Sequence, residues 1–571
     1  MKRINIYMMT AAMAILAAGC AKEIDTVNPA GEDVVFEASL SETEADAKAV
    51  LIPGKAASKV EWVKGDLVGV YAGTSYYEYK ADKSGGSSTL SPVGGSSLAE
   101  EYYAVYPYDA AATLAGGVIT TTLPSEQTPA LESFSYHLAV AHSESLTLNF
   151  RNVCGLFAAE VTEPNAVTKI EIMGNANEDL AGKIAITVGD TPSWSAIEGV
   201  KTVSISAPQG KTLQLGTYYM AVLPQDFAAG VTVTAYYKDG TSYVKNVTDK
   251  VTVAASGLVG GKIASGEWKI EHLLTGIGNN PEDIVLAPDG NFYVTTRGTV
   301  KGVWKYDANA NTNTAIASSP NTTLLVNSFP WGGDFDQNGL FYFAAKGSIN
   351  TYASRVLTCT STGTIAEYSI GIPWEYNNIM KILCAADGTL YVLVRGANGT
   401  SGQGKVYKVK DNAVLYTWSL TNKLYEYMCF NADKTKIFVL PNNSGDIQLI
   451  NLADNSMQKI AGTGVNHSNA ATYTDGTPGN PLTATLMQCE GAICAPDGTL
   501  YFSEIKSTIR MFVPDANGDY SKGTIRTIAG KPYDTTVLNY PNGLALAADG
   551  KTLYFADNGG KIGKVYYQKY E

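Results

Sequence analysis

The stretch Ala-Ile-Cys-Ala-Pro-Asp-Gly-Thr-Leu-Tyr-Phe at residues 492–502 decides the fold of this chain. It has the pattern of an apolar strand, a tight Asp-Gly turn and a second strand rich in aromatic residues. Similar units recur around turn residues 289, 338, 387, 433, 497 and 549, at intervals of 49, 49, 46, 64 and 52 residues. A four-stranded propeller blade takes about 40–50 residues. The repeat therefore predicts a six-bladed β-propeller over residues 267–571.

The last blade is one strand short, because the sequence ends soon after the apolar stretch 561–567. The segment Trp268–Leu274, just before the first unit, has the composition of a strand. We expect it to pair with the end of the chain. Such pairing closes the ring and removes the open sheet edge.

Three segments of the repeat carry a family resemblance: Ile460–Gly464, Tyr473–Leu482 and Tyr540–Leu546. With them the region 267–571 resembles the NHL-repeat propellers, and also the gluconolactonase-like and strictosidine-synthase-like propellers. The resemblance implies the propeller architecture. It also raises the alternative of a metal-dependent hydrolase or lyase.

The residue seven places before each turn residue should line one mouth of the central channel. Counting back gives Glu282, Trp331, Met380, Glu426, Glu490 and Asn542. Carboxylate and amide oxygens suit a hard cation such as calcium, and the Trp331 ring could stack on a sugar. The alternative is that these residues merely cap strands and face water.

The resemblance to the gluconolactonase-like family points to two of these positions as metal ligands, namely Glu282 and Asn542. The first motif is altered here to Pro281-Glu282-Asp283. The other ligands of the family have no clean match, since Met380 and Glu426 occupy the ring instead. A calcium site is thus one possibility that the sequence leaves open.

Residues 36–265 show short period-two strands between turn clusters, which is typical of a β-sandwich. Family motifs include Trp62–Tyr71, Tyr103–Tyr108, Tyr218–Gln225 and Gly260–Lys262. On these motifs the region resembles the fimbrillin-like lipoproteins of Bacteroidetes. The resemblance implies two β-sandwich lobes and a role in surface structures. The whole chain is then expected to be all-β, with fimbrillin-like lobes followed by a propeller.

The N-terminus has the pattern of an export signal, with Lys2 and Arg3 ahead of the apolar run Met8–Ala18. That run is shorter than the roughly 20 residues that span a bilayer. Residues 16–20 resemble a bacterial lipobox, which implies a signal peptide over 1–20, lipidation of Cys20 and a tether over 21–35. The lipobox resemblance implies an anchor in the outer membrane. The next residues, Ala21–Asp25, resemble the surface-export signal of Bacteroidetes lipoproteins, which favours the cell surface. A plain signal peptide with an incidental Cys is the alternative.

The composition and the missing motifs argue against several classes of function. The formal charge is −12, or −14 after loss of Lys2 and Arg3, and no basic patch suggests nucleic acid as a partner. We find no zinc spacing, no Walker or Ser-nucleophile motif, and four His, of which His467 is expected in an exposed loop. No catalytic residue is assigned.

The favoured prediction is a membrane-anchored surface lipoprotein, more a binding protein than an enzyme, whose propeller captures a glycan or protein ligand for adhesion or nutrient capture. The alternatives are the gluconolactonase-like hydrolase or lyase and a fimbria-associated subunit.

Overall fold

The computed structural model describes residues 33–40, 61–277, 280–319, 321–326, 328–347, 354–372, 378–395, 404–420, 424–443, 445–465, 470–505 and 507–570. Cys20, most of the expected tether and His467 lie outside these residues. The described part is built of strands, with one short helix, α1 (Thr323–Val326), and three 3-10 turns, η1 (Ala470–Thr472), η2 (Pro481–Thr483) and η3 (Tyr520–Lys522). None of its helices is long and apolar enough to cross a membrane.

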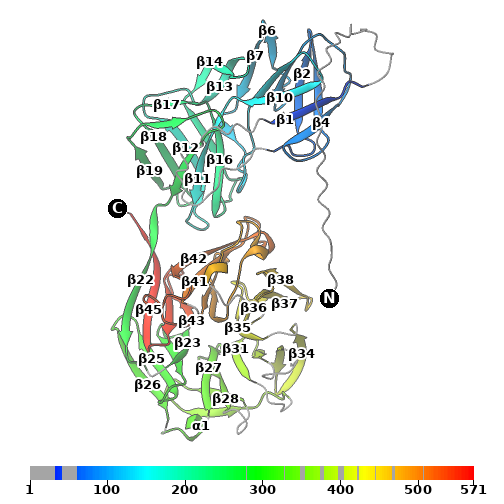
Figure 1. Cartoon of the computed structure of the whole chain (residues 1–571). Coiled ribbons are helices and arrows are strands. Elements are labelled where there is room, and N and C mark those ends of the chain that lie inside the picture. Colours follow the sequence, from blue (N-terminus) through cyan, green and yellow to red (C-terminus); the bar gives the residue numbers. More distant parts are fainter. Residues whose placement is uncertain are drawn as a thin grey trace, which may run out of the picture.

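The C-terminal half is a propeller, in which the described residues form six four-stranded sheets (Figure 1). The predicted fold class is confirmed for this half. Strands of the first three blades are β23 (Pro281–Leu286), β24 (Phe292–Thr296), β25 (Gly302–Asp307), β26 (Thr312–Ser318); β27 (Ser328–Phe335), β28 (Phe341–Gly347), β29 (Arg355–Cys359), β30 (Ile365–Tyr368); β31 (Ile379–Cys384), β32 (Leu390–Val394), β33 (Lys405–Lys410), β34 (Ala413–Ser419).

Blades four to six follow the same order from the channel outwards. Their strands are β35 (Tyr425–Phe430), β36 (Lys436–Pro441), β37 (Ile447–Asn451), β38 (Met457–Ala461); β39 (Cys489–Cys494), β40 (Leu500–Glu504), β41 (Thr508–Val513), β42 (Thr524–Gly530); β43 (Pro541–Leu546), β44 (Leu553–Asp557), β45 (Lys561–Lys569), β22 (Gly266–Thr275).

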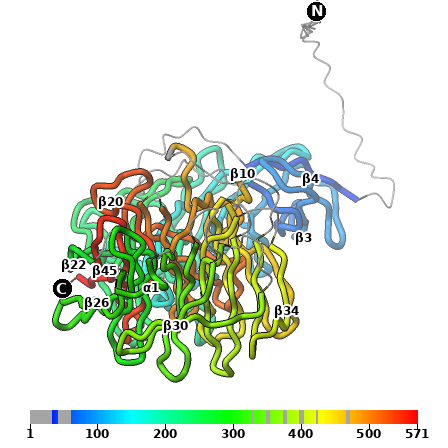
Figure 2. The backbone as a smooth tube through the Cα atoms, turned by 90° about the horizontal axis from the view of Figure 1, so that it is seen from below, coloured from blue at the N-terminus to red at the C-terminus, as the bar shows by residue number. Residues whose placement is uncertain are grey.

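The ring closes where the sequence predicted. Strand β22 pairs antiparallel with β45, from Gly266 opposite Lys569 to Thr275 opposite Lys561. The two strands lie side by side in both views (Figures 1 and 2). The sixth blade thus takes its outer strand from the segment that leaves the N-terminal half.

The turn between the first two strands of each blade explains why the motif repeats. The Asp289 carboxylate accepts a hydrogen bond from the backbone N–H of Asn291 at 3.1 Å, and Asp497 does the same for Thr499 at 2.9 Å. The next position needs a positive φ, which glycine adopts most easily. Five blades place glycine there, at 290, 339, 388, 498 and 550, whereas the fourth blade places Lys434 with φ 57°.

The first N-terminal lobe is a closed barrel among the described residues. It closes because β1 pairs parallel with β10 and antiparallel with β4. In barrel order the strands are β1 (Phe36–Leu40), β10 (Thr147–Asn152), β9 (Ala139–Ser143), β5 (Tyr102–Tyr106), β2 (Leu67–Ala72), β3 (Ser75–Ala81) and β4 (Ser87–Pro92).

The second lobe consists, in the part described, of four separate sheets. They are β16 (Gly216–Val222), β11 (Gly155–Val161), β21 (Leu258–Ile263); β19 (Ser242–Val247), β18 (Val231–Tyr237), β12 (Val167–Gly174), β15 (Thr202–Ser206), β8 (Glu126–Gln127); β14 (Ser193–Val200), β13 (Ala181–Thr187), β7 (Val118–Leu123), β6 (Thr113–Ala115); and β17 (Gln225–Phe227), β20 (Val251–Val253).

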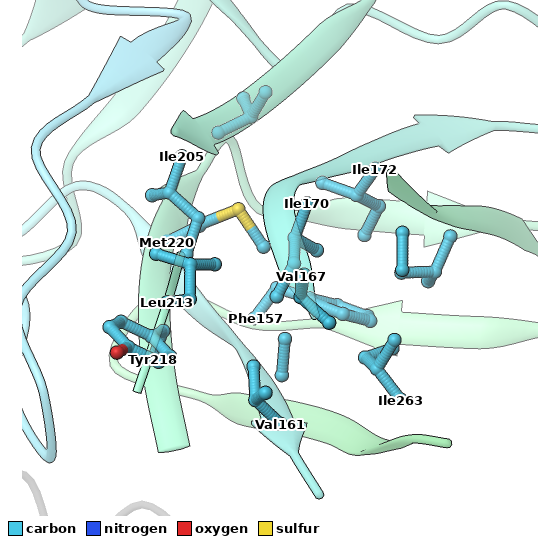
Figure 3. Close-up of a cluster of buried hydrophobic side chains, with 14 of the residues drawn as sticks. Phe157, Val161, Val167, Ile170, Ile172, Ile205, Leu213, Tyr218, Met220 and Ile263 are labelled. Carbon is cyan, nitrogen blue, oxygen red and sulfur yellow. The ribbon is translucent and has the colours of Figure 1, made fainter. Parts of the chain in front are cut away.

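Side chains of the second lobe, among them Phe157, Ile170 and Met220, pack into one apolar core (Figure 3). The first lobe has a further apolar cluster that includes Phe36 and Trp62, while its Val105 and Val140 pack with the core of the second lobe. Sandwich packing of both lobes is not confirmed, since the first is a barrel. The second lobe contacts the fifth blade, where Asn165 donates to the Asp497 carboxylate at 3.0 Å.

Candidate functional site

The predicted mouth residues lie where the pairing of each inner strand with its neighbour is interrupted. In each blade the register between the inner strand and its neighbour shifts at or next to the mouth position, as between Pro281 and Asp283 or between Tyr425 and Tyr427. The skipped residue is Glu282, Met380, Glu426 or Glu490 in four blades, Trp331 with Gly332 in the second, and Gly543 beside Asn542 in the sixth. Bulges of this kind re-aim side chains.

The mouth residues do not face water, as the alternative supposed. Exposed fractions are 3% for Glu282, 7% for Trp331, 0% for Met380, 1% for Glu426, 7% for Glu490 and 5% for Asn542. The six-strand channel therefore brings these side chains into its interior instead of leaving them on the surface.

Cations that the sequence analysis missed accompany the glutamates. Nε of Arg297 donates to the Glu282 carboxylate. Arg395 lies 3.3 Å from Glu426, whose other partner is the Asn442 amide at 2.5 Å. A signal was available: Arg297, Lys346 and Arg395 each stand eight places after the turn residue of their blade (289, 338 and 387).

Trp331 is enclosed by two of these cations. The Arg297 guanidinium carbon lies 4.8 Å from its ring centroid, and Lys346 Nζ lies 5.0 Å from it. Both contacts are cation–π interactions. Stacking of a sugar on Trp331 would require at least one of the two side chains to move, so that role stays a prediction.

We define the mouth cluster as Glu282, Glu426 and Glu490 together with Arg297, Lys346 and Arg395. The carboxyls of this cluster have raised pKa values. Burial raises the pKa of Glu282 to about 8 in spite of the Arg297 charge. Burial also raises the pKa of Glu426, against the opposing charge of Arg395. For Glu490, burial and then the charges of the other two glutamates raise the pKa well above its ordinary value. Burial lowers the pKa of Lys346.

The other two mouth residues are held by their neighbours. The Asn542 amide donates to the carbonyl oxygen of Pro281 at 2.6 Å and so ties the sixth blade to the first. Met380 packs in an apolar cluster with Trp331. Neither contact presents a reactive group to the channel.

One residue further along the inner strands lies a second buried group, which we name the plug: Asp283, Lys381 and Tyr427. Lys381 Nζ donates to the Asp283 carboxylate at 2.6 Å, to the Gly333 carbonyl at 2.7 Å and to the Tyr427 hydroxyl at 2.7 Å. The Tyr427 hydroxyl donates to Asp283 at 2.5 Å. Gly543 makes room, since a Cβ there would lie 2.5 Å from Asp283 Cα.

The residues present do not fit a calcium cage. Among the described residues no group of three or more His, Cys, Asp or Glu side chains is arranged to hold a metal ion. The Glu282 carboxylate accepts a hydrogen bond from Arg297, and the Asn542 amide donates one to the carbonyl oxygen of Pro281. Metal binding by Glu282 and Asn542 stays a prediction for a calcium titration to test.

The fold defines the class as a six-bladed propeller preceded by β lobes. No family model matches the chain, and no curated protein matches it. An auxiliary nutrient binding protein from Bacteroides thetaiotaomicron is 10% identical with a TM-score of 0.41, covering 79% of this chain and 97% of that one. A similar protein from Bacteroides ovatus is 11% identical with a TM-score of 0.39, covering 79% and 97%. A gluconolactonase from Xanthomonas campestris is 11% identical with a TM-score of 0.36, covering 53% and 90%.

Proposed function

We propose that the mouth of the propeller binds a hydroxyl-rich ligand, such as the end of a glycan. One observation carries the proposal: the carboxyls of Glu282, Glu426 and Glu490 are buried on the inner strands, and the first two lie beside the cations Arg297 and Arg395. Burying such groups costs folding free energy, and carboxyls with strongly raised pKa values cluster at functional sites. A ligand that meets these groups would offset part of that cost.

The chemistry of the cluster matches hydroxyl groups. A sugar hydroxyl both donates and accepts, so it needs partners of both kinds. Arg297 and Arg395 supply donors, and the carboxyl oxygens of Glu426 supply acceptors. The protonated form of a carboxyl, which burial favours at Glu490, both donates and accepts. Charge-assisted hydrogen bonds of this type are the stronger ones. The apolar contact comes from Met380 and Trp331.

We further propose that the protein presents this mouth from the outer membrane, anchored through lipidated Cys20. The basis is the export and lipobox pattern of residues 1–20. Capture of a nutrient glycan or adhesion to a host glycan would both use the same site. Labelling with a radioactive fatty acid, lost in Cys20→Ala, tests the anchor independently of the ligand.

Glu426→Gln is the decisive variant for the mouth cluster, because it replaces a carboxyl oxygen beside Arg395 with an amide nitrogen, which cannot accept a hydrogen bond. We expect the full chain to bind at least one glycan on an array, and the variant to bind it at least about tenfold more weakly in calorimetry. Glu367→Gln is the matched control, since Glu367 forms an exposed ion pair with Arg355 in the same propeller. It should bind as the unaltered chain does.

Two results would contradict the proposal. One is equal binding by Glu426→Gln and the unaltered chain. The other is a full chain that binds no glycan yet hydrolyses a lactone in the presence of calcium, which would favour the hydrolase alternative. Loss of that hydrolysis in Glu282→Gln would then assign the activity to the same mouth.

A further inference from the structure

The channel has a second cavity on the other side of the plug. Its volume is about 280 Å³, and all six inner strands line it. Its floor is the plug pair Lys381 and Tyr427, and its walls include Leu286, Leu383 and Leu544. The volume is near the lower limit for small-molecule sites. The mouth cluster contributes none of its described lining residues.

The polar groups of the floor are already satisfied. Lys381 uses its hydrogen bonds on Asp283, Gly333 and Tyr427. The Asp334 carboxylate accepts from the backbone N–H of Phe335 at 2.8 Å and of Cys384 at 2.9 Å. A molecule in this cavity would therefore meet a floor whose hydrogen bonds are already made. It would meet apolar side chains on the walls, with Asn431 and Lys434 among the polar lining residues.

The rim of the cavity has one feature that the fold does not explain. Lys434 lines it and occupies the positive-φ turn position that the other five blades give to glycine. A residue with a Cβ is strained there, and strain of this kind is found at functional sites. Its ammonium lies 5.5 Å from the centre of the Phe430 ring and has no ion pair among the described residues. In contrast, the carboxylates of Asp433 and Asp336 accept hydrogen bonds from backbone N–H groups of their own turns.

We propose that this cavity binds a small organic anion, with an apolar body against the leucine walls and a carboxylate on Lys434. Apolar lining calls for an apolar body. The Lys434 ammonium at the exposed rim calls for a negative end. The carboxylate among the described lining residues, that of Asp334, lies in the floor and accepts two backbone hydrogen bonds there. The site is separate from the mouth and does not depend on the function proposed for it.

The test titrates the full chain with octanoate and with 3-phenylpropionate by calorimetry. We expect at least one to bind with a Kd below about 1 mM, and octanol to bind at least about tenfold more weakly than octanoate. Lys434→Gly should weaken binding by about tenfold or more while folding normally, because it restores the turn glycine. Lys551→Gly is the matched control: it removes a lysine from the corresponding turn of the sixth blade, outside the cavity lining.

Crystals grown with 8-bromooctanoate locate the site through the anomalous signal of bromine. The proposal requires the bromine between Leu383 and Leu544, with the carboxylate at Lys434. It is overturned if neither acid binds, if Lys434→Gly binds as well as the unaltered chain, or if the bromine lies elsewhere.

Discussion

The plug and the mouth cluster occupy successive levels of one channel. Buried charge is fully compensated in the plug but only partly compensated in the mouth cluster. In the plug, Asp283 and Lys381 have side chains 0% and 6% exposed, and both are saturated with hydrogen bonds. In the mouth, burial outweighs the opposing charges, so the pKa of Glu282 rises to about 8. Satisfied buried charge is what a structural support needs. Incompletely compensated charge is what a binding site keeps available.

Removing one partner of the plug should give the largest effect. Lys381→Met leaves the fully buried Asp283 carboxylate without its counter-charge, which costs about 3–5 kcal/mol of stability. Denaturant unfolding of the full chain, followed through the propeller transition, measures it. Adding Asp283→Asn to the same chain should recover part of the loss, because the unpaired charge is then gone. If Lys381→Met lowers the unfolding free energy by less than about 1 kcal/mol, the proposed difference in charge compensation between the plug and the mouth cluster is wrong.

The mouth should make stability depend on pH in the direction opposite to a salt bridge. The pKa of Glu282 is raised from 4.5 to about 8 on folding, so the native state binds the proton more tightly. Its stabilising contribution is complete below about pH 4.5 and is lost as the pH rises to about 8. The slope from this group is at most about 1.4 kcal/mol per pH unit. Burial lowers the pKa of His137 to about 4, which gives a slope of opposite sign below about pH 6.5. The melting temperature of the unaltered chain minus that of Glu282→Gln should therefore fall as the pH rises from about 4.5 to about 8. A difference that stays level or rises would be incompatible with the raised pKa of Glu282.

The smallest effect is expected at Glu490. Burial and the charges of the other two glutamates raise its pKa well above the ordinary value, which favours the neutral form that glutamine resembles. Glu490→Gln should therefore change the unfolding free energy by less than about 0.5 kcal/mol at pH 7. A loss of 2 kcal/mol or more would mean that Glu490 is ionised and paired, as the plug residues are.

The repeat predicted the whole propeller, whereas it located only the inner-strand residues of the mouth cluster. Counting seven places back from each turn found six inner-strand residues, because the bulge recurs at that level in each blade. The same count forward by eight would have found Arg297 and Arg395. A count of six places back would also have reached Asp283, Lys381 and Tyr427. The count could not show that these three side chains bond to one another, because they meet only when strands of three blades converge on one axis.

The first lobe shows the other limit. Alternating strands fit a barrel as well as a sandwich, because both bury one face of each strand. The outcome depends on the parallel pairing of β1 with β10, from Glu37 opposite Thr147 to Leu40 opposite Phe150. A contact between segments so distant in the chain leaves no mark in the local pattern of residues.

The seam between β22 and β45 has a consequence for biosynthesis. Residue 266 cannot meet residue 569 until the whole disc between them has been made. Until the sixth blade forms, an arc of the first five blades would leave the β23–β26 sheet without a neighbour on one side. Because contacts between such distant segments form slowly and exposed strand edges promote association, the closing strand pair completes the protection of the whole disc.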